Sequence, residues 1–315
     1  MEVTIEGVSK KIMDSISSVM VGQQEAQKLM IGAFLAGGHL LVEGVPGIAK
    51  TLMARLLAGA VDVNFSRIQF TPDLLPGDAL GSNIYRSNSG QFEFIKGPVF
   101  TNILLADEIN RAPAKTQSAL FEVMEEQQVT IDGVTYKLPT PFMVVATQNP
   151  IELEGTYPLP EAQLDRFMIR INMGFPGRAE EIEILHRFKS DFGRINEKDL
   201  KPVVSQAEIL SANALIQAIY IKDELINYLA DLAMATRNHE GLILGASPRA
   251  TLSILKMSKA MAGLSGREYV IPEDLLDVLK PALLHRLIID PEKAIAGQNV
   301  DAILTEIIDS VPIPR

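Results

Sequence analysis

Residues 43–51, EGVPGIAKT, have the residue types of a phosphate-binding loop. Such loops place a glycine, four variable residues, a second glycine, a lysine and a serine or threonine in that order. Gly44, Lys50 and Thr51 fit this order, whereas Ala49 stands where the second glycine is expected. An apolar stretch precedes the loop and a helical pattern follows it, which is the context that phosphate binding requires. A glycine-rich strand-to-helix turn without a ligand is the alternative.

Each part of this loop has a defined task at a phosphate site. Backbone N–H groups at the turn and at the helix N-terminus can bind phosphate oxygens, with help from the helix dipole. Lys50 supplies a positive charge for the β- and γ-phosphates, and Thr51 supplies a hydroxyl ligand for Mg²⁺. Gly44 and Gly47 allow the loop to turn tightly. We expect Ala49 to lie at the helix start with a negative φ, where a methyl group costs little.

Two adjacent carboxylates, Asp107 and Glu108, follow a second apolar stretch in NILLADEIN. Open α/β sheets bind ligands at the carboxyl ends of their strands, which is where this pair would lie. Asp107 is suited to hold Mg²⁺ through water, and Glu108 to orient and deprotonate an attacking water. The alternative is a strand that ends in two solvated acids, and the phosphate-type loop upstream makes it less favoured.

A third apolar stretch, FMVVATQNP, ends in Gln148 and Asn149. An amide at this place is able to hydrogen-bond both an attacking water and a γ-phosphate. The alternative is an ordinary turn at Asn149-Pro150 that ends the strand.

Arg249 gives an independent indication of an anion. In GASPRATL, Ser247 is the expected N-cap and Pro248 the first helical residue, so Arg249 falls in the first turn. The helix dipole disfavours a cation there by about 0.3–1 kcal/mol. We therefore expect an anionic partner, which is either a protein carboxylate or a γ-phosphate reached from a second domain.

The pattern between residues 39 and 175 predicts a parallel sheet with crossover helices. Two helices are expected within residues 8–36, on either side of VGQQ (21–24). Two hairpins are expected, one at Asp132-Gly133 and one at the turn 87–90. The expected strands are HLLVEG (39–44), FSRIQFT (65–71), NILLADE (102–108), FMVVATQN (142–149) and FMIRINM (167–173).

After Phe175-Pro176-Gly177 the sequence indicates only helices, at 178–190, about 206–238, 248–262 and 272–289. We expect two domains, an α/β domain at 1–175 and a helical domain at 176–315.

The composition excludes several classes of protein. A net charge of −10 and a pI near 5.0 disfavour a nucleic-acid-binding function, because phosphate backbones attract basic surfaces. Cysteine is absent and the four histidines have no ligand spacing, which disfavours a thiolate or histidine metal site. No apolar run reaches the roughly 18 residues of a membrane span. Without a signal-peptide pattern, a cytoplasmic protein is expected.

Five stretches together resemble the MoxR family of AAA+ ATPases: GVPGIAKT, LLADEINRAPAKTQSALFEVMEE, ATQNP, LPEAQLDRF and GASPRA. In that family an alanine commonly precedes the loop lysine, so the resemblance accounts for Ala49. It implies Walker A at Gly44, Val45, Pro46, Gly47, Ile48, Ala49, Lys50, Thr51 and Leu52. It also implies Walker B at Asp107 and Glu108, sensor 1 at Asn149, sensor 2 at Arg249, an arginine finger at Arg166, and Val21 and Gly22 near the adenine.

The resemblance implies a P-loop AAA+ domain with a five-stranded parallel sheet and inserted hairpins, followed by an all-helical lid domain. It implies ATP and Mg²⁺ as cofactors, a hexameric ring, and remodelling or maturation of partner proteins, among them von Willebrand factor A domain proteins. A nucleic-acid motor, an ATP-gated binding module with little turnover and a small-molecule P-loop kinase are the alternatives. An Arg166 paired with Asp165 or Glu161 is the alternative to an arginine finger.

Overall fold

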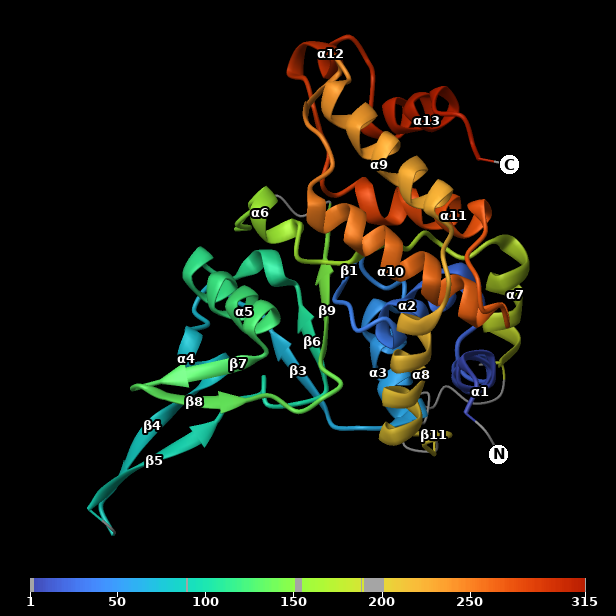
Figure 1. The fold of residues 1–315 in the computed structure, drawn as a ribbon. Helices are drawn as coiled ribbons and strands as arrows, with labels where there is room; N and C mark the ends of the chain where they lie inside the picture. Colours follow the sequence, from blue (N-terminus) through green and yellow to red (C-terminus); the bar gives the residue numbers. More distant parts are fainter. Residues whose placement is uncertain (1–2, 89, 151–154, 188, 190–200, 315) are drawn as a thin grey trace.

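A five-stranded parallel sheet with the order β10-β1-β9-β6-β3 forms the centre of the molecule (Figure 1). The computed structural model describes residues 3–88, 90–150, 155–187, 189 and 201–314. In chain order the strands are β1 (Leu40–Glu43), β3 (Phe65–Gln69), β6 (Ile103–Asp107), β9 (Met143–Gln148) and β10 (Ile169–Asn172). All five expected strands are confirmed, each somewhat shorter than its apolar pattern.

The sheet is covered on both faces, which explains why β6 and β9 are buried along nearly their whole length and apolar through their middles rather than alternating. Alternate apolar residues of β1, β6 and β9 enter two separate apolar clusters. One face packs against α2 (Gln24–Leu35) and α3 (Lys50–Ala60), and α1 (Ile5–Ser17) packs on these two helices. The other face packs against α5 (Ala114–Glu126), with α4 (Pro76–Leu80) and the 3₁₀ turn η1 (Ile109–Arg111) at its margin. The helices α3 and α5 therefore lie in different layers (Figure 1).

Both expected hairpins are present and they project together from the α5 side of the molecule (Figure 1). They are β4–β5 (Gly81–Arg86 and Gln91–Lys96) and β7–β8 (Gln128–Ile131 and Val134–Lys137). Asp132 and Gly133 have φ of 50° and 81°, as their turn requires. The hairpins are joined by stacking of Phe94 on Tyr136, with 4.4 Å between ring centroids, and by a 2.5 Å hydrogen bond from Asn83 to Asp132. In the other expected turn, 87–90, position 89 lies outside the described residues.

The described residues of the C-terminal part, 176–315, which we call the lid, are largely helical as expected, but the details differ from the prediction. Of the helix expected at 178–190, positions 188 and 190 lie outside the described residues. The helix expected at 206–238 is two helices, because Ile219 leaves the helical conformation with φ −57° and ψ 129°. The helix expected at 272–289 ends at Leu283. The helices are α7 (Arg178–Arg187), α8 (Gln206–Ala218), α9 (Asp223–Asn238), α10 (Pro248–Leu264), α11 (Pro272–Leu283), α12 (Pro291–Ile295) and α13 (Val300–Ser310), after α6 (Glu161–Leu164) in the first part.

Two pairs of very short strands were also not expected. In the lid, β12 (Leu242–Leu244) and β13 (Ile288–Ile289) pair antiparallel. The start of the lid is tied to the first part by parallel pairing of β11 (Val204–Ser205) with β2 (Val61–Asp62). Strands of two or three residues leave no alternation for a sequence pattern to report.

The sheet and the lid share one apolar cluster. Helix α1 packs against α2, α3, α8 and α10, and α11 packs against β10. The domain boundary at 175/176 remains a prediction, and no gap in the apolar packing marks it. Within the part of the chain that the structure describes, no helix combines the length and the apolar character that a membrane crossing needs.

Candidate active site

The loop between β1 and α3, which the sequence predicts to bind phosphate, is tightly packed on one side. Gly44 is required there, because a Cβ would lie 2.2 Å from the Ile48 side chain and 2.7 Å from the carbonyl oxygen of Met173. Val45, Ile48 and Leu52 pack against the core, whereas Pro46 and Gly47 are exposed. The apolar residues thus anchor the loop, and its open side is left to the backbone.

Ala49 does not have the negative φ that we expected. It is the N-cap of α3 and has φ 69° and ψ 27°, in the left-handed region. The expectation was wrong because the alanine lies one residue before the helix, where the loop reverses direction. A left-handed alanine costs about 1–2 kcal/mol, and the surrounding contacts must offset this cost.

Lys50 and Thr51 connect the loop to the neighbouring strands. The Lys50 ammonium donates to the carbonyl oxygen of Gly44 and, at 2.9 Å, to that of Gln148 at the end of β9. The Thr51 hydroxyl donates to Asp107 Oδ2 at 3.2 Å. The structure therefore brings the loop and the Asp107 carboxylate together, as the sequence predicted.

The Asp107 carboxylate is buried and fully engaged. Thr147 Oγ1 donates to Oδ1 at 2.6 Å, and Arg67 donates to Oδ2 through Nε at 3.0 Å and Nη2 at 2.7 Å. Arg67, which the sequence analysis missed, supplies the positive charge that balances this carboxylate. The only sequence signal for it is a basic residue inside the expected strand 65–71.

The donor set at Asp107 fits Mg²⁺ that arrives with a nucleotide. A carboxylate and the Thr51 hydroxyl lie side by side, and no group of three or more acidic or histidine side chains suited to a metal occurs among the described residues. Magnesium characteristically uses one or two carboxylates, waters and substrate phosphates. Thr51 and Asp107 are therefore the residues that would hold it.

Glu108 is held in place by three neighbours. Its backbone has φ 56°, and its N–H donates to Thr147 Oγ1 at 2.9 Å. Its Oε2 accepts from Gln69 Nε2 at 2.8 Å and from Arg111 Nη1 at 3.0 Å. Gln69 ends β3, the strand next to β6, so its place in the sheet gives it access to Glu108. The sequence analysis missed Gln69 and Arg111.

Asn149 is buried at the end of β9, beside the site rather than on the surface. It lines a cavity of about 410 Å³ together with Glu43 and Arg170. These two form an ion pair with 3.4 Å between Arg170 Nη1 and Glu43 Oε2. Asn149 is thus placed at the same sheet edge as Lys50 and Glu108, which was the expectation from the strand pattern.

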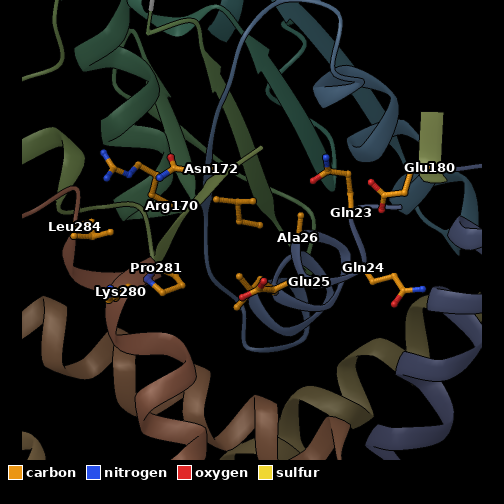
Figure 2. A pocket seen from close by; sticks show the side chains of 12 residues that line it. Gln23, Gln24, Glu25, Ala26, Arg170, Asn172, Glu180, Lys280, Pro281 and Leu284 are labelled. Carbon is orange, nitrogen blue, oxygen red and sulfur yellow. The ribbon is translucent and has the colours of Figure 1, made fainter. Parts of the chain in front are cut away.

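A second cavity of about 420 Å³ lies between the start of α2, the end of β10, α7 and α11. Gln23 and Glu180 lie across this cavity from Lys280, Pro281 and Leu284 (Figure 2). Gly22 lies at its rim, since a Cβ there would be 2.1 Å from Glu180 Oε1, and Val21 precedes it. The cavity is within the range of about 300–1,000 Å³ usual for small ligands.

This cavity adjoins the phosphate-type loop through one segment. Gln23 donates to the carbonyl oxygen of Gly174 at 2.9 Å, and the preceding Met173 touches Gly44. A nucleotide base near Val21 and Gly22, as the resemblance implies, is therefore compatible with phosphates at the loop.

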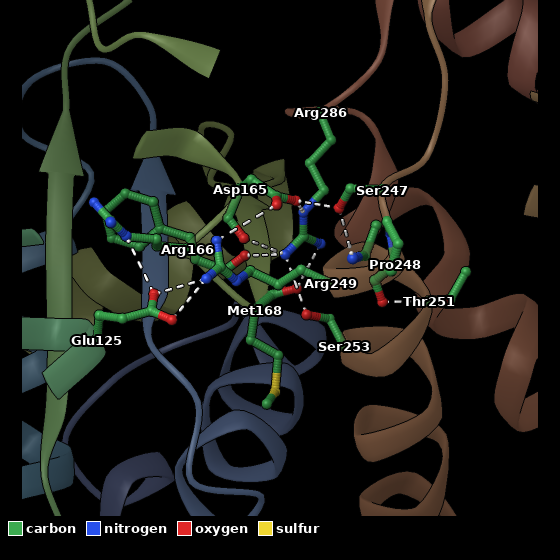
Figure 3. Close-up of polar contacts among 12 residues, drawn as sticks. Glu125, Asp165, Arg166, Met168, Ser247, Pro248, Arg249, Thr251, Ser253 and Arg286 are labelled. Atoms are coloured by element: carbon green, nitrogen blue, oxygen red, sulfur yellow. Dashed lines mark hydrogen bonds and ion pairs between the residues drawn. The ribbon is translucent and has the colours of Figure 1, made fainter. Parts of the chain in front are cut away.

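Arg166 and Arg249 converge on one carboxylate, Glu125 of α5 (Figure 3). Arg249 Nη2 donates to both Glu125 oxygens at 2.7 and 2.8 Å, and Arg166 Nε donates to Oε2 at 3.3 Å. The Arg166 guanidinium also lies 5.9 Å from the centroid of the Phe121 ring. Arg249 thus has the protein carboxylate that was one of its two expected partners, and Arg166 pairs with neither Asp165 nor Glu161.

The two arginines and the loop lysine lie in different layers of the molecule. Arg166 and Arg249 contact α5, and Arg249 also pairs with Asp165, whereas α5 covers the face of the sheet opposite to α3. Lys50 and Thr51 begin α3. The structure therefore separates the predicted site residues into one group at the sheet edge and a second group beside α5.

Comparison with known proteins matches both parts of the chain. The profile of the ATPase family associated with various cellular activities (AAA) matches residues 39–169, and that of the AAA lid domain matches residues 234–307. YeaC of Bacillus subtilis, an uncharacterised protein, is 43% identical over 96% of this chain and 94% of its own length.

Two further relatives extend this result. The chaperone MoxR1 of Mycobacterium tuberculosis is 42% identical over 95% of this chain and 81% of its own length. A crystal structure of a candidate ATPase from Cytophaga hutchinsonii superposes with a TM-score of 0.90 at 42% identity, covering 99% of this chain and 96% of that one. Because these similarities span the sheet and the lid alike, this chain belongs to the MoxR family of AAA+ ATPases.

Proposed function

We propose that this protein is a Mg²⁺-dependent ATPase that acts in the cytoplasm as a ring, with each active site shared between two subunits. The observation that carries the proposal is the separation of the two groups of site residues. Lys50, Asp107 and Glu108 lie at the sheet edge, whereas Arg166 and Arg249 lie together beside α5. Heterologous packing would place the second group of one subunit against the first group of the next.

Within such a site each residue has a task that follows from its position. Lys50 binds the β- and γ-phosphates, with backbone N–H groups of the loop. Glu108 orients the attacking water and accepts its proton, and Asn149 donates to the γ-phosphate. Thr51 and Asp107 would hold Mg²⁺, which when bound would supply positive charge beside the phosphates. Arg166 of the neighbouring subunit stabilises the negative charge that develops in the transition state.

Arg249 belongs with Arg166 in this proposal. Both guanidinium groups pair with the same Glu125 carboxylate, so the two positive charges lie close together. We therefore assign Arg249 to the neighbour's γ-phosphate rather than to the nucleotide beneath its own lid.

The projecting hairpins support a protein rather than a nucleic acid as the partner. Apolar side chains are exposed on them: Tyr85 is 57% and Phe92 72% exposed. Among the nearby basic residues, Arg86 pairs with Glu93 at 2.7 Å, whereas Lys96, 5.2 Å from the Phe100 ring centroid, and Lys137 are exposed, so the hairpins carry few free positive charges. This surface suits remodelling of polypeptide partners, von Willebrand factor A domain proteins among them.

The test is the ATPase rate per subunit as a function of protein concentration, for wild type and Arg166→Ala. A shared site predicts a rate that rises with concentration, as hexamers form, and collapses in Arg166→Ala although ATP binding is retained. A rate that is independent of concentration and survives the substitution would contradict a shared site.

Two other functions give different results in the same preparation. A nucleic-acid motor predicts DNA or RNA binding whose affinity falls steeply with salt. An ATP-gated binding module predicts assembly with ATP but hardly any turnover, even at concentrations where wild type is fully assembled.

A further inference from the structure

Arg286, which follows α11, is an arginine almost completely removed from water. Its side chain is 2% exposed, and burial lowers the pKa of its guanidinium to about 10, so that it stays charged near neutral pH. A buried charge costs free energy, and a well-packed apolar side chain would often serve stability as well or better. A buried arginine therefore needs an explanation beyond packing.

Its hydrogen bonds are concentrated on the segment that contains Arg166 (Figure 3). Nη2 donates to the carbonyl oxygens of Asp165, at 3.0 Å, and Phe167, at 2.6 Å. Nη1 donates to that of Met168 at 3.2 Å, and Nε to Asp165 Oδ1 at 2.9 Å. The planar guanidinium thus fixes the backbone on both sides of Arg166, which a single ammonium group cannot reproduce.

The same group of contacts also fixes the start of α10. Asp165 Oδ1 accepts from Ser247 Oγ at 2.8 Å, and Ser247 is the N-cap of α10. Ser253, one turn into that helix, accepts from Arg286 Nη2 at 3.1 Å. Arg166 and the N-terminus of α10, which carries Arg249, are therefore held in one arrangement by Arg286 and Asp165.

We propose that Arg286 is a positioning residue for ATP hydrolysis: it holds residues 165–168 and the start of α10 so that Arg166 and Arg249 are presented together to the neighbouring subunit. This inference rests on the shared site proposed above. In this proposal Arg286 acts through Arg166 and makes no contact of its own with the nucleotide or the attacking water.

The test uses mixed rings in which the two halves of a site come from different subunits. Glu108→Gln subunits supply Arg166 but do not hydrolyse, and Arg166→Ala subunits supply a complete sheet-edge site. A shared site predicts that the mixture hydrolyses ATP well above either component alone. Arg286→Lys is then added to one component at a time.

In the arginine-supplying Glu108→Gln subunit, Arg286→Lys is expected to lower the activity of the mixture by about tenfold or more, because small misplacements of a catalytic group have large effects. In the Arg166→Ala subunit it is expected to change activity less than about twofold. Equal losses with Arg286→Lys in either component of the mixture, or no loss with either, would overturn the proposal. A general structural role of Arg286 would affect both components alike.

Two controls keep the result interpretable. Arg267→Lys alters another charged lid pair, in which Arg267 donates to Asp274 at 2.6 Å through both Nη groups, and it should leave both mixtures unchanged. If Arg286→Lys does not fold, as judged by thermal unfolding, Ser253→Ala removes a single contact of Arg286. Its smaller loss should again be confined to the arginine-supplying subunit, and a loss in both would contradict the proposal. A parental mixture without activity refutes the shared site itself.

Discussion

The Glu125 carboxylate accepts two hydrogen bonds from Arg249 Nη2, at 2.7 and 2.8 Å, and so occupies the place an anion would take in front of this arginine. Glu125 also accepts from Arg166. Its side chain is 39% exposed, so water weakens these pairs without abolishing them. For a neighbouring phosphate to bind both arginines, it has to displace this carboxylate.

Glu125→Gln should therefore favour the assembled, active state. Removing the charge while keeping the shape weakens two exposed ion pairs, which is expected to lower the protein concentration for half-maximal ATPase by about two- to fivefold. The measurement is the concentration dependence of the rate. Glu122→Gln, an exposed glutamate of the same helix, is the matched control. A loss of activity in Glu125→Gln would instead mean that Glu125 orients the arginines productively.

Glu108→Gln should separate binding from turnover. The amide keeps the contact with Gln69 but cannot accept a proton, so the ATPase rate should fall by at least about a hundredfold. ATP affinity, measured with a fluorescent nucleotide, should stay close to that of wild type. Normal turnover in this variant would remove Glu108 from the mechanism.

Ala49 allows a direct test of the left-handed loop. Glycine adopts φ 69° without strain but gains freedom in the unfolded chain, so Ala49→Gly should change the free energy of unfolding by less than about 1 kcal/mol. Ala49→Val should lose about 1–3 kcal/mol, because β-branched residues resist this region. Denaturant unfolding of both variants measures the difference. A larger loss for glycine than for valine would contradict the backbone argument.

His39 should make the protein sensitive to mild acid. Its ring is buried, Nδ1 accepts from the Val144 N–H at 3.0 Å, and Nε2 lies 3.1 Å from the Met124 carbonyl oxygen, which defines a neutral ring. Burial lowers its pKa from 6.5 to about 4. Between these values the unfolded chain binds a proton that the folded chain does not, so stability is complete above pH 6.5 and decreases toward pH 4.

This effect corresponds to about 2 kcal/mol between pH 7 and pH 5. His39→Gln cannot titrate and should lose that much less stability over the same interval, whatever its stability at pH 7. Denaturant unfolding at several pH values provides the comparison. Parallel pH profiles for the two proteins would show that another group is responsible, such as His285, whose pKa burial also lowers.

The fold was predictable because its pattern is local and strong. The strands β1, β6 and β9 at the middle of the sheet are largely apolar because both faces of the sheet are covered there. Each chemical motif lies at or directly after the end of a strand, so finding the strands also placed Lys50, Asp107 and Asn149 at one edge. The break at Ile219 could not be predicted, because the apolar pattern of the sequence continues through it. Directly after the break, Tyr220 pairs with Tyr269, which is distant in the sequence.

The supporting residues could not be found in the same way. Gln69 reaches Glu108 only because β3 and β6 are neighbours in the sheet, although they are distant in the chain. Glu125 bonds arginines that are 41 and 124 positions away. Apart from its bond to Ala282, Arg286 bonds Ser253, which is 33 positions away, and the segment 165–168, which is at least 118 positions away. The sequence shows an alanine at position 49, but the sign of its φ depends on the conformation of the whole loop.

The packing of α1 has a consequence for how the chain is made. Helix α1 buries Ile5, Val8, Ile12 and Ile16 partly against α8 and α10, which begin only at Gln206 and Pro248. During synthesis the apolar side of α1 stays without those partners until the lid has emerged. Contacts so distant in the chain also slow folding. A protein proposed to remodel others therefore completes its own core only after its lid has been synthesised.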